Sequence, residues 1–84
     1  MPQLTIRVAE LETDITEYCE QRNSGSASAA DEEQAADDVQ ELIHLARRGR
    51  PMVRDALAEV SIVLRTDCSG SALQRRVDRA LAAL

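Results

Sequence analysis

The sequence contains no Trp, no Phe and no Lys, and Tyr18 is its only aromatic residue. Without other aromatic side chains, the core must be filled by Leu, Ile, Val, Met and Ala, which bury less surface per residue. A chain of 84 residues buries only about 60–65% of its unfolded surface. Because a second copy often completes so small a core, we expect a homo-oligomer.

Cysteine is scarce, and long apolar runs are missing. Cys19 and Cys68 are too few and too far apart to indicate a disulfide scaffold or a zinc site. No stretch approaches the roughly 18 apolar residues that a membrane-spanning helix needs. The first fifteen residues are interrupted by Arg7, Glu10 and Glu12, so they lack the apolar region of a signal peptide. The sequence therefore predicts a cytoplasmic protein with no membrane partner and with reduced thiols.

Charged residues are plentiful but unevenly divided. Residues 1–42 hold 11 acidic and 2 basic residues, a net charge of −9. Residues 43–84 hold 4 acidic and 8 basic residues, a net charge of +4, and every basic residue in the chain is Arg. The first half therefore repels phosphate, whereas the second half could attract it.

Hydrophobic periodicity predicts four helices joined by short connections. The expected ranges are 9–22, 29–48, 51–66 and 72–84. Two of these helices start with the pattern of a capping box, Ser28 with Asp31 and Ser71 with Gln74. We therefore predict an all-α fold, in which residues 1–84 form a single helical domain built as a small antiparallel bundle of three or four helices.

The bundle interpretation has two consequences. It places Cys19 and Cys68 at the same end of the molecule, so a disulfide is possible although it is not implied. The third helix also has a wider apolar surface than one core requires, because Met52, Ile62 and Val63 fall outside its main stripe. We predict that these three residues take part in self-association.

Residues 3–8 fit two structures. Leu4, Ile6 and Val8 alternate with polar residues, which is the period of a strand. If the segment instead continues the first helix, Ile6 lies on the side that faces water. Both a short N-terminal strand and a helix therefore stay open here.

The segment Gln3-Leu4-Thr5-Ile6-Arg7-Val8, followed by a helix, resembles the start of a ribbon-helix-helix DNA-binding protein. In that family two such strands pair in a dimer and present alternate polar residues to the major groove. The resemblance implies that Gln3, Thr5 and Arg7 read DNA, and many antitoxins share this layout. A DNA-binding regulator or antitoxin is therefore one alternative function, although the charge of −9 on this half disfavours direct nucleic-acid binding.

Carboxylates are dense along the first two predicted helices. Those that open the second helix complement its dipole, but those of the first helix continue through every turn. Such residues most often form a solvated surface, and the alternative is an acidic face that binds a basic partner protein. The residues that we assign to this acidic face are Glu10, Asp14, Glu17, Asp37, Asp38 and Glu41.

Arginines in the second half form a predicted basic patch. Without Lys or aromatic stacking platforms, this patch suits salt bridges within the fold or a dimer better than nucleic acid. Its members are Arg47, Arg48, Arg50, Arg54, Arg75, Arg76 and Arg79.

The sequence gives little support to catalysis. Glu41 and His44 have the Glu-x-x-His spacing of di-iron bundles, but a helix would turn both away from its apolar stripe. His44 is the only histidine, and Cys68 has no His near it in sequence. We therefore predict a protein with no metal, no cofactor and no enzymatic activity.

These features favour a protein that acts by binding another protein. A carboxylate-rich face can occupy the basic groove of a nucleic-acid-binding protein and block it. In size and charge the chain resembles small acidic inhibitors from phages and plasmids, including some anti-CRISPR proteins, and this resemblance implies an anti-defence function. Besides the DNA-binding regulator, a structural subunit of a larger assembly is the other alternative.

Overall fold

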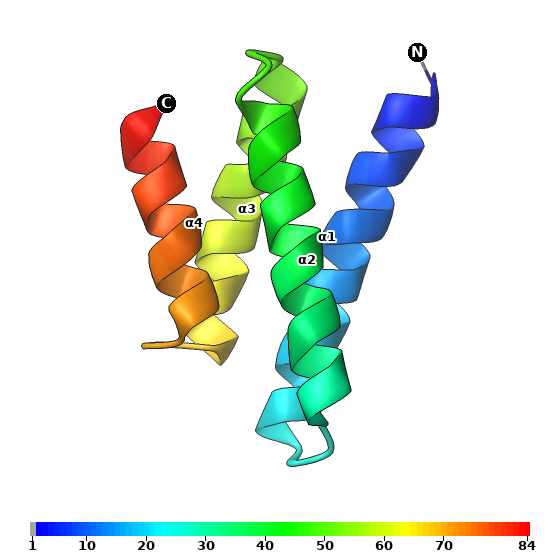
Figure 1. Cartoon of the computed structure of the whole chain (residues 1–84), viewed down its shortest axis with the longest axis vertical. Helices are drawn as coiled ribbons and strands as arrows, with labels where there is room; N and C mark the ends of the chain where they lie inside the picture. Colours follow the sequence, from blue (N-terminus) through cyan, green and yellow to red (C-terminus); the bar gives the residue numbers. More distant parts are fainter. Residues whose placement is uncertain (1) are drawn as a thin grey trace.

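The computed structural model describes residues 2–84, and in this part of the chain it contains four helices and no strand (Figure 1). This confirms the all-α prediction. The elements are α1 (Pro2–Asn23), α2 (Ala29–Ala46), α3 (Pro51–Asp67) and α4 (Ala72–Ala83). No helix within the described residues is both long and apolar enough to span a bilayer.

Residues 3–8 belong to α1, so of the two structures that the sequence allows for this segment, the helix is correct and the short N-terminal strand is wrong. Leu4 and Val8 lie one turn apart and both pack on the core, in line with the fully buried Leu11. Their spacing extends the apolar stripe of the helix, whereas Ile6 points outward and is 58% exposed. With no strand at this position, the ribbon-helix-helix interpretation loses the element that would carry its DNA-reading residues.

The start of α2 is closed by the predicted capping box. The Asp31 backbone N–H donates to Ser28 Oγ at 3.2 Å, and the Ser28 N–H donates to Asp31 Oδ2 at 3.0 Å. The helix ends at Ala46, two residues earlier than expected. Its last turn tightens there, and Gly49 adopts a φ of +85°, which ends the helix before Pro51 opens α3.

The start of α4 carries only half of the predicted capping box. Ser71 Oγ accepts from the Gln74 backbone N–H at 3.2 Å, as expected. The Gln74 side chain, however, accepts from the N–H of Gly70 at 2.7 Å rather than from that of Ser71. Gly70 has a φ of +78°, a conformation that costs glycine little, and this turns its N–H toward Gln74.

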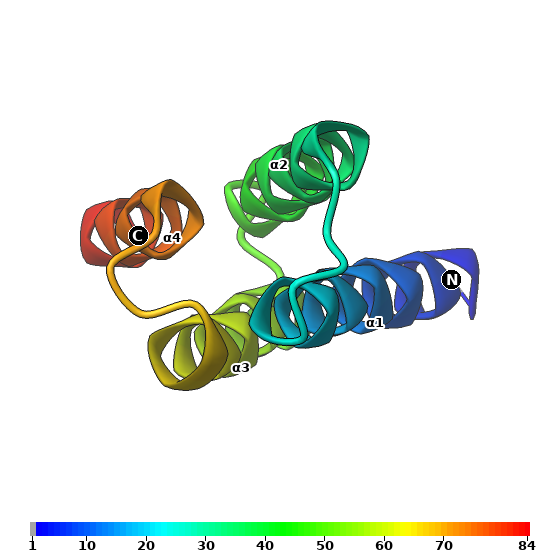
Figure 2. The same cartoon turned by 90° about the horizontal axis from the view of Figure 1, so that it is seen from below.

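The four helices enclose one aliphatic core in a bundle-like arrangement. α1 packs against α2 and α3, and α4 packs against the same two helices on the other side. Figure 2 shows α2 and α4 lying over α1 and α3, with α1 and α4 farthest apart. In Figure 1 the two chain ends and the α2–α3 connection lie at one end of the molecule, opposite the other two connections. The largest fully buried side chains are Leu11, Ile15, Leu42, Leu57 and Leu64.

A polar contact inside this arrangement joins α3 to α4. Ser61, which is buried, donates its hydroxyl to Asp78 Oδ1 at 2.8 Å, and Arg65 Nη2 lies 3.1 Å from the same oxygen. The hydrogen bond from Ser61, supported by Arg65, holds the pKa of Asp78 below its ordinary value. The ionised carboxylate is therefore the form that the fold stabilises.

Candidate functional site

The predicted acidic face is divided into two parts. Arg7 of α1 reaches across to α2, where its Nη2 lies 2.7 Å from Glu41 Oε1, and it also contacts Glu10 at 3.2 Å. The hydrogen bond from Arg7 holds the pKa of Glu41 below its ordinary value. Glu10 and Glu41 are therefore already paired with one of the protein's own guanidinium groups.

The other part of the face has no such counter-charge. Within residues 2–84, no arginine lies within ion-pair distance of Asp14, Glu17, Asp37 or Asp38. Asp14 and Glu17 are exposed on neighbouring turns of α1, and Asp37 is exposed on α2. This part of the face therefore has no internal counter-charge from an arginine.

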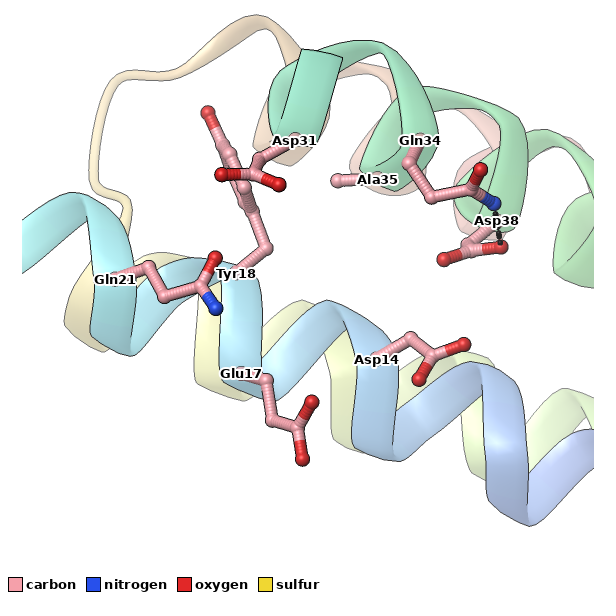
Figure 3. Close-up of a pocket in the computed structure, with 8 residues that line it drawn as sticks. All are labelled: Asp14, Glu17, Tyr18, Gln21, Asp31, Gln34, Ala35 and Asp38. Carbon is pink, nitrogen blue, oxygen red and sulfur yellow. Dashed lines mark hydrogen bonds between the residues drawn. The ribbon is translucent and has the colours of Figure 1, made fainter. Parts of the chain in front are cut away.

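Three of these four residues line a pocket of about 230 Å³ between α1 and α2 (Figure 3), which we call the α1–α2 pocket. Asp14 from α1 and Asp38 from α2 extend into the space between the helices, whereas Glu17 points away from α2 at the rim. The ring of Tyr18 rises from α1 toward the start of α2 and closes one end. The other lining residues are Gln21, Asp31, Gln34 and Ala35.

Asp38 lies at the buried side of the pocket rather than on the solvated surface, with only 3% of its surface exposed. Its Oδ1 accepts from Gln34 Nε2 at 3.1 Å, but its Oδ2 is buried and has no hydrogen-bond partner within residues 2–84. In Figure 3 this second oxygen points toward the middle of the pocket. A buried acceptor without a donor costs about 1–3 kcal/mol, which makes Asp38 the strongest candidate for a binding group.

The buried position of Asp38 changes the pKa of its carboxyl group. Desolvation raises the pKa of Asp38, and the nearby negative charge of Asp14 raises it further, while the hydrogen bond from Gln34 lowers it. A perturbed carboxyl group that lines a pocket is typical of a functional site. A cation in the pocket would stabilise the ionised form of Asp38.

Charge alone does not identify the two amide side chains that line the pocket, Gln21 and Gln34. The sequence pattern that could identify them is a row of polar residues at helical spacing, next to the apolar stripe of the helix. Asp31, Gln34 and Asp38 follow the i, i+3, i+7 pattern on α2, and Asp14 lies two turns from Gln21 on α1. Such polar stripes next to the buried face lie where two helices meet, so they can line a shared groove.

The arginines that were predicted to form one basic patch are all exposed but fall into two groups. One group surrounds the α2–α3 connection and comprises Arg47, Arg48, Arg50 and Arg54. The other group lies on α4 and comprises Arg75, Arg76 and Arg79, of which Arg76 lines a cleft with Tyr18 and Glu32. The two groups come from separate elements, and neither supplies an ion pair to the α1–α2 pocket within the described residues.

The residues assigned to self-association differ in their surroundings. Ile62 is 62% exposed and Met52 is 39% exposed. They lie ten residues apart on α3, a separation of about 15 Å along the helix axis. Val63 is half-buried and packs against the core. The outward apolar surface of α3 therefore consists of Met52 and Ile62 without Val63.

Cys19 and Cys68 lie together at one end of the core. Both are free and fully buried, and their sulfur atoms are 2.9 Å apart. Burial raises the pKa of Cys19 to about 12, and the hydrogen bond with Cys68 acts in the same direction. Because the thiolate is the reactive form, this environment keeps the Cys19 thiol unreactive.

No protein-family model, no curated protein and no solved structure matches this chain. Across residues 2–84, no three His, Cys, Asp or Glu side chains are arranged to hold a metal ion. His44 is exposed on α2, and the carboxylate of nearby Glu41 is engaged by Arg7. The α1–α2 pocket itself presents carboxylate oxygens that can accept hydrogen bonds, among them the unpaired Oδ2 of Asp38.

Proposed function

We propose that this protein acts without catalysis, by binding the basic surface of another protein through the carboxylates of α1 and α2. The main support is that Asp14 and Asp38 line one pocket and have no ion pair to an arginine within residues 2–84. Negative charge without an internal counter-charge attracts cationic surfaces and speeds their association. The rest of the acidic face, where Arg7 pairs with Glu10 and Glu41, contributes less to this attraction.

The partner that we favour is a nucleic-acid-binding protein or complex, which this protein would inhibit. Such proteins present arginine and lysine side chains where phosphates bind, and carboxylates can occupy the same places. The size and charge of the chain support this, since they resemble those of small phage and plasmid inhibitors, including some anti-CRISPR proteins. In this role the protein needs no cofactor and competes directly with nucleic acid.

Competition with DNA tests this function. Purified basic nucleic-acid-binding proteins, each loaded with fluorescent duplex DNA, would be titrated with the wild-type protein while fluorescence anisotropy is measured. We expect release of the DNA from at least one of them. The affinity should fall steeply between about 0.05 and 0.5 M salt, because the screening length shrinks from about 14 Å to about 4 Å.

Two double variants with equal charge changes make this experiment specific. Asp14→Asn with Glu17→Gln removes two carboxylates at the α1–α2 pocket, and we expect at least tenfold weaker competition. Glu20→Gln with Glu33→Gln removes two exposed carboxylates from the same helices but away from the pocket lining. Failure to release DNA from any protein in the panel, or an affinity that is insensitive to salt, would overturn the proposed function.

A second candidate function is that of a subunit in a homo-oligomer or larger assembly. The observation in its favour is the exposure of Ile62 and Met52 on α3, since large apolar side chains are usually covered when partners are present. A helix that presents apolar residues on two sides can pack against a second copy of the chain. The two functions are compatible, because the residues that line the α1–α2 pocket all come from α1 and α2.

A further inference from the structure

We propose that the α1–α2 pocket binds one arginine side chain of the partner protein, with Asp38 and Asp14 accepting hydrogen bonds from its guanidinium group. This inference rests on the proposed function and names the group that is recognised. The observation that carries it is the geometry of Asp38, whose buried Oδ2 lacks a donor within residues 2–84 and points into the pocket (Figure 3).

The polar walls of the pocket offer acceptors. Gln34 donates its amide N–H to Asp38, and this leaves the Gln34 carbonyl oxygen available to accept. Asp14 contributes two more carboxylate oxygens from the opposite helix. A ligand that carries several N–H donors and no acceptor suits this arrangement, because each of its groups can be satisfied at once.

The charge of the pocket requires a cation. Asp14 and Asp38 face the same space, and the nearest contribution of opposite sign comes from Arg7, which is already bonded to Glu10 and Glu41. A neutral ligand would leave two carboxylates close together without compensation. A positively charged ligand removes their repulsion and also supplies the donor that Asp38 lacks.

Shape and donor number favour guanidinium over other cations. Across the described residues, no three acidic, His or Cys side chains converge as metal ligands. An ammonium group is more strongly hydrated and loses more when it enters a half-buried site. A guanidinium group is flat and carries five N–H donors, so its hydrogen bonds can be shared between Asp38 and Asp14.

The size of the pocket limits the ligand to one side chain. About 230 Å³ is below the roughly 300–1,000 Å³ that is usual for small-molecule sites. The pocket also opens between two exposed helix surfaces, so a long side chain from a docked protein can enter it while the partner's backbone stays outside. The pocket therefore recognises one side chain of the partner protein, at the centre of a larger charged interface.

Titration with short peptides tests this inference directly. The probes are three blocked pentapeptides, Gly-Gly-X-Gly-Gly, in which X is arginine, lysine or citrulline. Citrulline keeps the shape of arginine but is uncharged. With the ¹⁵N-labelled protein, we expect saturable NMR shifts for Asp38, Gln34 and Asp14 with the arginine peptide, at least about threefold weaker binding of the lysine peptide, and none of the citrulline peptide.

Three variants complete the test. Asp38→Asn keeps the size of the side chain but removes its charge, and we expect at least about tenfold weaker binding of the arginine peptide, because a buried hydrogen-bonded charge pair is lost. Asp14→Asn changes an exposed residue, and it should weaken binding as well. The double variant Glu20→Gln with Glu33→Gln should bind the peptide like the wild type.

The outcomes separate this inference from the proposed function. If DNA competition works but Asp38→Asn competes as well as the wild type, the arginine pocket is wrong while the acidic-surface function stands. If the arginine peptide binds at the pocket but no basic protein is engaged, the pocket stands and the proposed function falls. Shifts scattered over the surface, or equal binding of arginine and citrulline peptides, would overturn the pocket.

Discussion

Asp38 is a carboxylate that the fold buries without fully satisfying it. One of its oxygens is bonded to Gln34 and the other has no partner within residues 2–84. A group held in this way lowers the stability of the free protein, and such costs are typical of binding sites. We therefore expect stability and binding to respond in opposite directions when Asp38 is changed.

The first prediction concerns stability. At pH 7, Asp38→Asn should raise the free energy of unfolding by about 1 kcal/mol, because it removes an unpaired buried charge while Gln34 keeps an oxygen acceptor. Urea unfolding followed by circular dichroism measures this difference. If Asp38→Asn is less stable than the wild type at pH 7, the prediction is wrong, and the ionised Asp38 carboxylate stabilises the fold.

The same residue makes a prediction about pH. Because the folded-state pKa of Asp38 is raised above 3.8, protonated Asp38 is the form that the fold favours. The stability that protonated Asp38 contributes is fully present below pH 3.8 and is lost as the pH rises through the higher pKa that Asp38 has in the folded protein. The difference in free energy of unfolding between the wild type and Asp38→Asn should therefore widen from pH 3 to pH 7. A difference that stays constant over this range would contradict the raised pKa of Asp38.

At the residue scale, the sequence identified the acidic residues but not their surroundings. Asp14 and Glu17 are exposed, as a count of charges suggests. Asp38 lies at the edge of the apolar stripe of α2, and its burial depends on how closely α1 approaches, which the sequence of α2 alone does not encode. The resemblance to a DNA-binding family assigns Arg7 to DNA reading, whereas in the structure Arg7 pairs with Glu41 of the next helix, a residue 34 positions away in sequence.

At the scale of elements, the contact between α3 and α4 depends on Ser61. Ser61→Ala should lower the free energy of unfolding by about 1 kcal/mol at pH 7, because Asp78 loses a hydrogen bond in a buried setting. Thr66→Ala is the matched control, since it also removes a hydroxyl from α3 but breaks only a bond to its own helix. Thermal or urea unfolding of the three proteins measures the effect.

The pH dependence of that contact has the opposite sign to that of Asp38. Because the pKa of Asp78 is lowered in the fold, its contribution is present above the ordinary value of 3.8 and is lost as the pH falls through the folded value. The difference between wild type and Ser61→Ala should therefore shrink in acid. A difference that persists at pH 2 would mean that Ser61 acts through packing alone.

The first turns of α1 allow a direct test of helix against strand. Val8→Ala should cost about 1–3 kcal/mol, because Val8 is buried in the core. Ile6→Ala should change stability by less than about 0.5 kcal/mol, because Ile6 points into solvent. Equal and large losses for the two variants, measured by urea unfolding, would indicate that residues 3–8 bury both side chains.

Elements were predicted well where local signals agree. The capping box at Ser28 and the period of the apolar residues identified α2 from the sequence, apart from its last two residues. Residues 3–8 stayed ambiguous because their side chains satisfy both periods, and only packing against α2 and α3 decides between them. At the start of α4, the side chain of Gln74 had two N–H groups within reach, and the sequence does not distinguish them.

At the scale of the whole molecule, the exposed surface of α3 predicts self-association. Ile62→Asp should convert an oligomer to a monomer, because a carboxylate would be buried at the interface. Multi-angle light scattering of the wild type and the variant measures the mass. Arg54→Asp is the control, because Arg54 is exposed on the same helix and makes no ion pair within residues 2–84. A wild-type protein that is monomeric at high concentration would contradict the interface.

The all-helical architecture followed from the sequence, because four apolar stripes with short connections allow few other folds. The position of the α1–α2 pocket did not. It depends on which helices become neighbours, and α2 packs against all three of the others. Charge composition therefore indicated only that acidic residues gather on the first two helices, while the structure shows where two carboxylates from different helices line one pocket.

The separation of α1 from α4 has a consequence for how the molecule moves in solution. α1 carries a net charge of −3 and α4 a net charge of +2, and Figure 2 shows these two helices farthest apart. Opposite charges on separated helices give the molecule a dipole along the line from α4 to α1. If the proposed function is correct, a cationic partner surface attracts the α1 side and repels the α4 side, so it approaches the α1 side first.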